Sequence, residues 1–300
     1  MSSLSDCIPW MTVGVAESAA IVTLNLCTII FFMRNRNLRK RSTYLVINLA
    51  VIDMFVGGPV VFNLFFWPGV HCNLWKWHSI EQRTNISVRQ VLTSLFPIAT
   101  LTNITTIALE RVHATFYALR HRVLKKWVYR FIIAGVWVIS GLLTIAHRVL
   151  IASIETYYYG VTVLLTFSSI FPLIICISYT SIVIKVRCGA QPQHHGAARR
   201  ERKLTMILLI VTVVSLLLYL PHVIWLFVRY ISKHEIERTL SFSVFVHVDF
   251  VLVFLLFANS LVNPILYAIR MPEYRSAVLV LFRKRPQQQR EVEALRLREM

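Results

Sequence analysis

The sequence predicts an all-α membrane protein, a seven-transmembrane helix bundle. The chain of 300 residues is 56% hydrophobic and only 15% charged, with a mean hydropathy of +0.62, which is too apolar for a soluble domain of this length. Seven apolar stretches reach the length of about 20 residues that crosses a bilayer. Basic residues gather in alternate connections between the stretches, the bias typical of cytoplasmic loops.

The apolar stretches are residues 9–33, 44–67, 86–112, 128–147, 158–184, 204–228 and 242–268. The first has no basic residue before it and is followed by "RNRNLRKRS", which favours an uncleaved span with its N-terminus outside. We therefore expect a plasma-membrane protein with a short extracellular N-terminus (1–8) and a helical domain (9–268). Residues 269–300 would lie in the cytoplasm and include a basic tail, in which "RKRP" (283–286) meets anionic lipids.

Polar residues lie inside three of the stretches. Asp53 falls in the middle of the second and Thr100 in the third, and Asn259, Ser260 and Asn263 share one face of the seventh. A carboxylate with hydroxyls and amides forms an oxygen cage suited to a hard cation such as Na⁺. The alternative is a hydrogen-bond network that only satisfies Asp53, and the spacing alone slightly favours this alternative.

Charged residues and a proline mark the ends of other stretches. Glu110 and Arg111 lie where the third stretch becomes a loop, and Glu201 is the lone acid among the bases that open the sixth. The pair Asn263–Pro264 places a kink-forming proline beside a buried amide in the seventh.

Together these residues resemble rhodopsin-like (class A) G-protein-coupled receptors along essentially the whole chain. No single motif is specific, but seven in the right order on seven spans are. They are Asn25, "NLAVID" with Asp53, "LERV" with Arg111, Trp137, Pro172, Pro221 and "NPILY" at 263–267. The resemblance implies a receptor, not an enzyme, that converts binding of an extracellular small ligand into nucleotide exchange on a heterotrimeric G protein.

The resemblance also implies a short amphipathic eighth helix, a cytoplasmic interfacial helix within residues 269–300, where "MPEYRSAVLVLFRK" follows the seventh span. It further implies residue roles. It favours the interpretation that the oxygen cage around Asp53 binds Na⁺ as an allosteric ion, and it implies no other cofactor. It implies a latch between Arg111, with its neighbour Glu110, and Glu201. It also assigns roles in receptor activation and G-protein coupling to Leu119, Pro221, Asn263–Pro264 and Tyr267.

The ligand is expected to be a lipid or another non-amine small molecule. Monoamine receptors carry an acid where this chain has Thr93, and opsins carry a lysine in the seventh helix, where residues 242–268 have none. Arg89 either meets an anionic head group or snorkels to the interface, with equal weight. Glu17 is either a pocket residue or a partner for a polar group of the seventh helix. The pocket-facing residues are Arg89, Thr93, Ser168, Tyr219, His222, Trp225 and Asp249.

Three positions depart from the family pattern. The usual Asp-Arg-Tyr is Glu110-Arg111-Val112, and Tyr219 replaces the tryptophan common in the sixth helix. The tyrosine expected in the fifth helix falls at Thr180, with Tyr179 one place early, which puts its water-bridged contact with Tyr267 in doubt.

Cys7 and Cys72 are the only cysteines on the outer side of the predicted topology, so a disulfide between them is expected, with two free thiols as the alternative. Asn85 in "NIS" is a glycosylation sequon on the same side, although close to the membrane.

Other classes fit the sequence less well. The net charge of +18 comes without the interleaved aromatic residues of a nucleic-acid binder, so no nucleic-acid partner is expected. The intramembrane histidines lie on different spans, which disfavours a membrane enzyme. A transporter or channel that uses the carboxylates of Asp53 and Glu17 is the remaining alternative, although no inverted repeat supports it.

Overall fold

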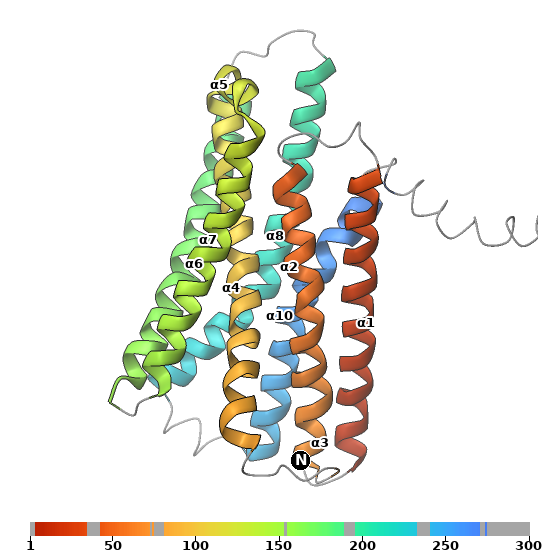
Figure 1. The fold of residues 1–300 in the computed structure, drawn as a ribbon, viewed down its shortest axis with the longest axis vertical. Helices are drawn as coiled ribbons and strands as arrows, with labels where there is room; N and C mark the ends of the chain where they lie inside the picture. Colours follow the sequence, from red (N-terminus) through yellow and green to blue (C-terminus); the bar gives the residue numbers. More distant parts are fainter. Residues whose placement is uncertain are drawn as a thin grey trace, which may run out of the picture.

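The computed structural model describes residues 4–34, 43–72, 74, 81–152, 155–188, 196–232, 241–270 and 274, and this part of the chain is a bundle of helices without strands (Figure 1). The elements are α1 (Leu4–Arg34), α2 (Thr43–Val61), the π-helical turn η2 (Phe62–Phe66), α3 (Trp67–His71), α4 (Glu81–Phe116), α5 (Ala118–Val123), α6 (Lys126–Ala152), α7 (Tyr157–Cys188), α8 (Gly196–Ile231) and α10 (Phe242–Arg270). In the described part, seven membrane-capable segments are found, six single helices and the α2–η2–α3 run, as the hydropathy predicts.

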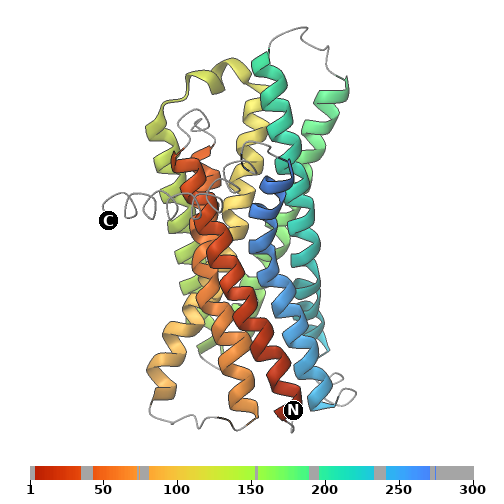
Figure 2. The same cartoon turned by 90° about the vertical axis from the view of Figure 1, so that its right-hand side faces the viewer.

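Helix α4 occupies the centre of the bundle and packs against α2, α6 and α7. Helix α1 lies against α2 and α10, and α8 packs between α7 and α10 (Figure 2). The start of α1 and the short α3 lie together at one end, hereafter the disulfide end, and α5 lies at the opposite end, hereafter the α5 end (Figure 1).

The buried apolar side chains form two clusters along the bundle. One includes Leu49, Tyr129 and Tyr267, and the other includes Ile52 and Phe257. Leu49 of the first cluster lies one turn before Asp53 on α2 and Val56 of the second lies about one turn after it, so the buried carboxylate lies at the junction of the two clusters.

Two glycines of the first helix pair allow close approach of backbones. A Cβ on Gly14 would lie 2.5 Å from the Cβ of Leu64, and a Cβ on Gly57 would lie 2.6 Å from Cγ2 of Val22. Small residues at helix contacts are the usual means of tight packing in membranes, so these glycines fix α1 against α2 and η2.

The structure corrects several predicted boundaries. The predicted helix 44–67 is α-helical only to Val61 and then widens into η2, because Pro68 lacks an N–H and its ring clashes with the carbonyl four residues earlier. Helix α1 begins at Leu4 rather than at residue 9, and α5 was not predicted at all. Of the predicted interfacial helix and basic tail (269–300), the structure describes only Ile269 and Arg270, which end α10, and Tyr274, which packs with Tyr267 in the buried core; "RKRP" lies outside the described residues.

Candidate functional sites

Three helices converge on Asp53, whose side chain is fully buried. The hydroxyls of Thr100 on α4 and Ser260 on α10 donate to its Oδ1 at 3.0 and 3.1 Å, and Nδ2 of Asn263 donates to its Oδ2 at 2.7 Å. Three of the four predicted cage partners are therefore in direct contact with the carboxylate. A buried carboxylate needs such donors, because an unpaired charge at this depth is costly.

The fourth predicted partner, Asn259, does not bond Asp53 and instead lines an adjoining cavity of about 20 Å³, roughly the room of one water molecule. Thr100 and Ser260 line the same cavity. Within the described residues, Oδ1 of Asn259 and Oγ of Ser215 are buried without a hydrogen-bond partner. These oxygens could coordinate one Na⁺ ion beside Asp53, and they could equally bond one ordered water molecule.

The second site lies at the α5 end and centres on Glu110. Its Oε2 forms an ion pair with Arg111, which is only 1% exposed. Its Oε1 accepts hydrogen bonds from Nε2 of His121 at 2.7 Å and from the Tyr129 hydroxyl at 3.0 Å. One carboxylate thus joins α4 to both α5 and α6.

Two more of the predicted coupling residues are Leu119 and Glu201. Leu119 on α5 is 80% exposed, so its apolar side chain lies outside the core. Glu201 lies in α8, but its side chain is outside the described part, so the predicted contact with Arg111 stays a prediction.

Asn263 and Pro264 lie within α10, and Tyr267 follows one turn later with its ring packed on Phe32 at 6.0 Å between centroids. Tyr179 is buried although it stands one place early, and its hydroxyl accepts from Thr212 at 3.3 Å. In the described part of the chain, the Tyr267 hydroxyl is buried without a partner. The structure therefore keeps an inward-facing tyrosine on α7 despite the shifted register.

The predicted pocket residues form two pairs nearer the disulfide end. The Tyr219 hydroxyl on α8 donates to Oγ of Ser168 on α7 at 3.0 Å, and both side chains are buried. Nε1 of Trp225 on α8 donates to Oδ1 of Asp249 on α10 at 3.2 Å.

Arg229, which was not predicted as a pocket residue, lies 3.3 Å from Oδ1 of Asp249 and forms an ion pair with it.

Two of the remaining predicted pocket residues carry polar groups without a described hydrogen-bond partner. Among the described residues, Oγ1 of Thr93 and Nδ1 of His222 are buried without a partner. The side chains of Arg89 and Asn85 lie outside the described part, although both residues belong to α4.

Glu17 on α1 is a further buried acid, and no described residue bonds either of its carboxylate oxygens. The expected polar partner on α10 is not found among the described residues. A pocket role for Glu17 remains a prediction.

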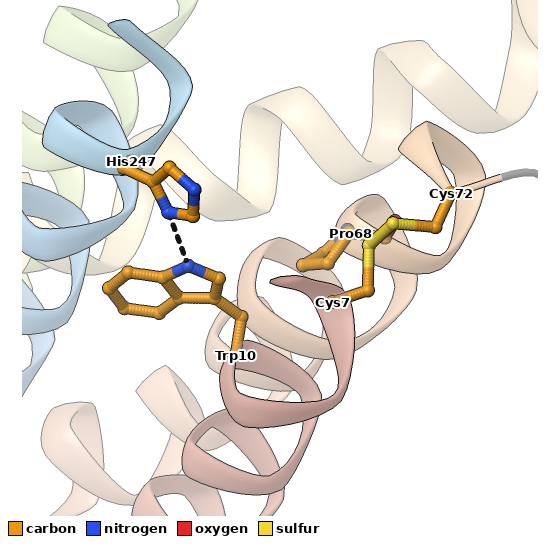
Figure 3. Close-up of a disulfide and its surroundings, with 5 residues drawn as sticks. All are labelled: Cys7, Trp10, Pro68, Cys72 and His247. Atoms are coloured by element: carbon orange, nitrogen blue, oxygen red, sulfur yellow. Dashed lines mark hydrogen bonds between the residues drawn. A yellow bond between two sulfur atoms is a disulfide. The ribbon is translucent and has the colours of Figure 1, made fainter. Parts of the chain in front are cut away.

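At the disulfide end, Cys7 and Cys72 are joined with their Cα atoms 6.5 Å apart, which ties the start of α1 to the residue after α3 (Figure 3). Beside the disulfide, Nε1 of Trp10 donates to Nδ1 of His247 at 3.0 Å, a contact that the sequence did not predict (Figure 3). Together these bonds fix α1 to both α3 and α10 at this end.

Replacing Cys7 by serine is expected to lower the thermal stability of the protein. The bond closes a loop between residues 65 apart, and such bonds typically stabilise by about 2–4 kcal/mol. We expect Cys72→Ser to have the same effect and the double variant to add nothing further. The matched control is Cys27→Ser, a free cysteine of the same helix. Recovery of either Cys7 or Cys72 as a free thiol in unreduced peptide maps of the wild type would contradict the bond.

Comparison with known proteins agrees with this arrangement. The profile of the 7 transmembrane receptor (rhodopsin family) matches residues 24–267, which covers most of the chain. The chain belongs to this family. The receptor is also similar to melanocortin receptor 3 of Homo sapiens, with 23% identity over 272 residues that cover 86% of this chain and 81% of that receptor. The family consists of receptors and not enzymes, which confirms the prediction of a receptor that is not an enzyme.

Proposed function

We propose that this receptor converts binding of an extracellular small ligand into nucleotide exchange on a heterotrimeric G protein. The observation that carries the proposal is the pair at the α5 end, where a buried Arg111 is held by Glu110 beside the exposed Leu119. In this conformation Glu110 keeps Arg111 from contacting a partner, whereas the apolar side chain of Leu119 is already exposed. This arrangement suits a docking surface that forms fully only when activation frees Arg111.

We infer from its charge that the α5 end faces the cytoplasm. Exposed basic side chains gather there on the ends of four elements, namely Arg34, Arg120, Lys126, Arg130, Lys185 and Arg187. The excess of lysine and arginine supports this end as the inner one. The disulfide at the other end supports exposure to the oxidising exterior, with the N-terminus outside at the plasma membrane.

Activation begins at the ligand-facing half of α8. A ligand that competes for Tyr219 or Ser168 alters the contact between α8 and α7 directly below Pro221. Since the proline weakens the helix at that point, the inner part of α8 swings outward. This motion separates Glu201 from Arg111 and opens a cleft for the C-terminal helix of a Gα subunit, with Leu119 seated in a hydrophobic pocket of Gα.

The last transmembrane helix takes part through its kink. Pro264 allows the inner end of α10 to bend inward, and Tyr267 then leaves its packing on Phe32. The approach of Tyr267 to the buried Tyr179 would satisfy its hydroxyl, which has no described partner in this conformation.

The pocket suits a lipid or another non-amine ligand. An amine ligand would need a carboxylate on α4 at the position of Thr93, and threonine supplies none. The carboxylate of Asp249 already contacts Trp225 and Arg229, so it is not available to an amine either. The unpartnered Thr93 hydroxyl and His222 imidazole are left to bond a neutral or anionic polar group.

Nucleotide exchange on purified G proteins, measured across a library that includes lipids and melanocortins, tests the proposal. We expect at least one compound to stimulate exchange through the wild-type receptor. Ion flux in proteoliposomes is the parallel measurement, because a transporter or channel would conduct without G protein. Flux without stimulated exchange would overturn the proposed function.

A further inference from the structure

A group of charged and aromatic side chains joins the last turn of α8 to the first half of α10 at the disulfide end. Arg229 on α8 and Asp249 on α10 form an ion pair, and Nε1 of Trp225 donates to the same carboxylate oxygen, Oδ1. The guanidinium carbon of Arg229 lies 5.0 Å from the centroid of the Phe245 ring, which lies 5.6 Å from the ring of Trp225. Two aromatic rings thus flank an ion pair whose side chains are 43% and 35% exposed.

The ion pair leaves most of the hydrogen-bonding capacity of Arg229 unused. A guanidinium has five N–H groups, and in the described part of the chain Arg229 makes one hydrogen bond, from Nη1 to Asp249. Asp249 receives both of its described donors on Oδ1, so only Oδ2 is left to accept. This oxygen offers fewer acceptor positions than Arg229 has unused N–H groups. The group therefore has a surplus of donors, which an additional acceptor would satisfy.

A buried nitrogen on the same face of α8 also lacks a partner. His222 precedes Trp225 by three residues and Arg229 by seven, so the three side chains share one face of the helix. Nδ1 of His222 is buried, and no described residue bonds it. An exposed arginine is commonly satisfied by water, whereas a buried ring nitrogen needs a bonded partner. The helical rise separates the positions of His222 and Arg229 by about 10 Å along the axis, a span that one small molecule can bridge.

We propose that Arg229 binds the anionic group, a carboxylate or a phosphate, of the ligand of this receptor. The inference rests on the proposed function, in which a non-amine small molecule binds the outer half of the bundle, and it narrows that ligand to an acid. The unused N–H groups of Arg229 form a planar fork that matches either anion. Contact with the face of the Phe245 ring holds the guanidinium in place. The body of the ligand extends inward along Trp225 and brings a polar group to His222.

Asp249 has two opposite effects on an anion bound at Arg229. Its hydrogen bond orients the guanidinium, whereas its negative charge repels the anion. Because both side chains are partly exposed, the ion pair is weak and the repulsion decides the sign. Removal of the charge of Asp249 therefore tightens the binding of an acid, whereas it would weaken the binding of a cation. The sign of this change separates the two classes of ligand.

The test measures the affinity of the full chain in lipid nanodiscs for probes that share one apolar chain. Oleate and oleyl phosphate carry the two acids, oleyl alcohol is the neutral probe and oleylamine is the cation. For the wild type we expect at least one acid to bind about tenfold more tightly than the alcohol, as one charge-assisted hydrogen bond would give. The amine should bind no more tightly than the alcohol.

Three variants assign the difference to residues. Arg229→Gln keeps an N–H donor but removes the charge, so the affinity for the acid should fall about tenfold, to that of the alcohol. Asp249→Asn keeps the size of the side chain, and the affinity for the acid should rise about threefold. Arg148→Gln is the matched control, because this arginine at the same end of α6 bonds Gln90 instead, and its affinity should equal that of the wild type. The rise with Asp249→Asn tests the proposal even if Arg229→Gln does not fold.

The outcomes separate the acid site from the proposed function. Equal affinity of the wild type for the acids and the alcohol overturns the site, and so does an amine that binds more tightly than the acids and loses affinity with Asp249→Asn. Acetate as competitor distinguishes two sources of the anion: displacement of the bound acid supports a soluble ligand and no displacement supports an amphiphile, and either result supports the site. Nucleotide exchange stimulated by a compound that binds the wild type and Arg229→Gln equally overturns the acid site and leaves the proposed function intact. Acid binding that requires Arg229, without stimulated exchange under any condition, supports the site and overturns the proposed function.

Discussion

Replacing Arg111 by alanine is expected to reduce ligand-stimulated nucleotide exchange about tenfold or more. Arg111 is the buried cation that we propose is released to the G protein, and loss of one partner of such a buried polar contact typically costs about 2–5 kcal/mol. Surface expression should largely persist, because Glu110 keeps the donors His121 and Tyr129 when Arg111 is gone. Exchange assays and surface labelling on the same cells measure both quantities.

The control for this change is Arg130→Ala, which removes an exposed arginine of α6 near the same end. It should leave exchange close to that of the wild type. If Arg111→Ala and Arg130→Ala reduce ligand-stimulated exchange equally, Arg111 has no specific role in coupling, and the loss reflects the lower positive charge of this end.

Glu201→Ala is expected to act in the opposite direction and to raise basal exchange. The predicted attraction between Glu201 and Arg111 borders water and is worth about 1 kcal/mol, so the rise should be about fivefold. Unchanged exchange in both Arg111→Ala and Glu201→Ala would refute the latch. Glu155→Ala, an exposed acid at the disulfide end, is the matched control.

The number and order of the spans could be predicted because the bilayer allows few solutions. Backbone groups in lipid must bond within a helix, so each apolar stretch of sufficient length becomes a helix. The ends could not be predicted in the same way. Helix α8 begins at Gly196 rather than at residue 204, because arginine, glutamate and lysine also favour helix and hydropathy marks the membrane rather than the end of the helix.

Some contacts of the candidate sites could be predicted from the sequence and others could not. Thr100, Ser260 and Asn263 were predicted as partners of Asp53 because each lies inside an apolar span and carries a polar group that needs a partner. The bonds from His121 and Tyr129 to Glu110 were missed. They join residues 11 and 19 apart through α5, a six-residue helix too short to be stable alone, so their contact depends on tertiary packing.

Replacing Asp53 by asparagine is expected to abolish stabilisation of the receptor by sodium. In the wild type, Na⁺ beside Asp53 would raise the melting temperature in NaCl over KCl at equal ionic strength, because a ligand that binds only the folded state stabilises it. Asparagine keeps the size of the side chain but removes the charge that attracts the cation. The same variant should lose any dependence of agonist affinity on sodium, since we propose that the ion favours the inactive state. Asp249→Asn, the control acid on α10, should keep the stabilisation by sodium in the melting experiment.

A second substitution separates the ion site from a network that only satisfies Asp53. Asp53→Ala leaves the donors of Thr100, Ser260 and Asn263 without their acceptor, and each buried unsatisfied group costs about 1–3 kcal/mol. Both readings therefore expect a lower melting temperature for Asp53→Ala. Only the ion site expects the wild type to melt later in NaCl than in KCl. Equal melting of the wild type in the two salts, with Asp53→Ala still destabilised, would leave Asp53 as the acceptor of a purely structural network between α2, α4 and α10.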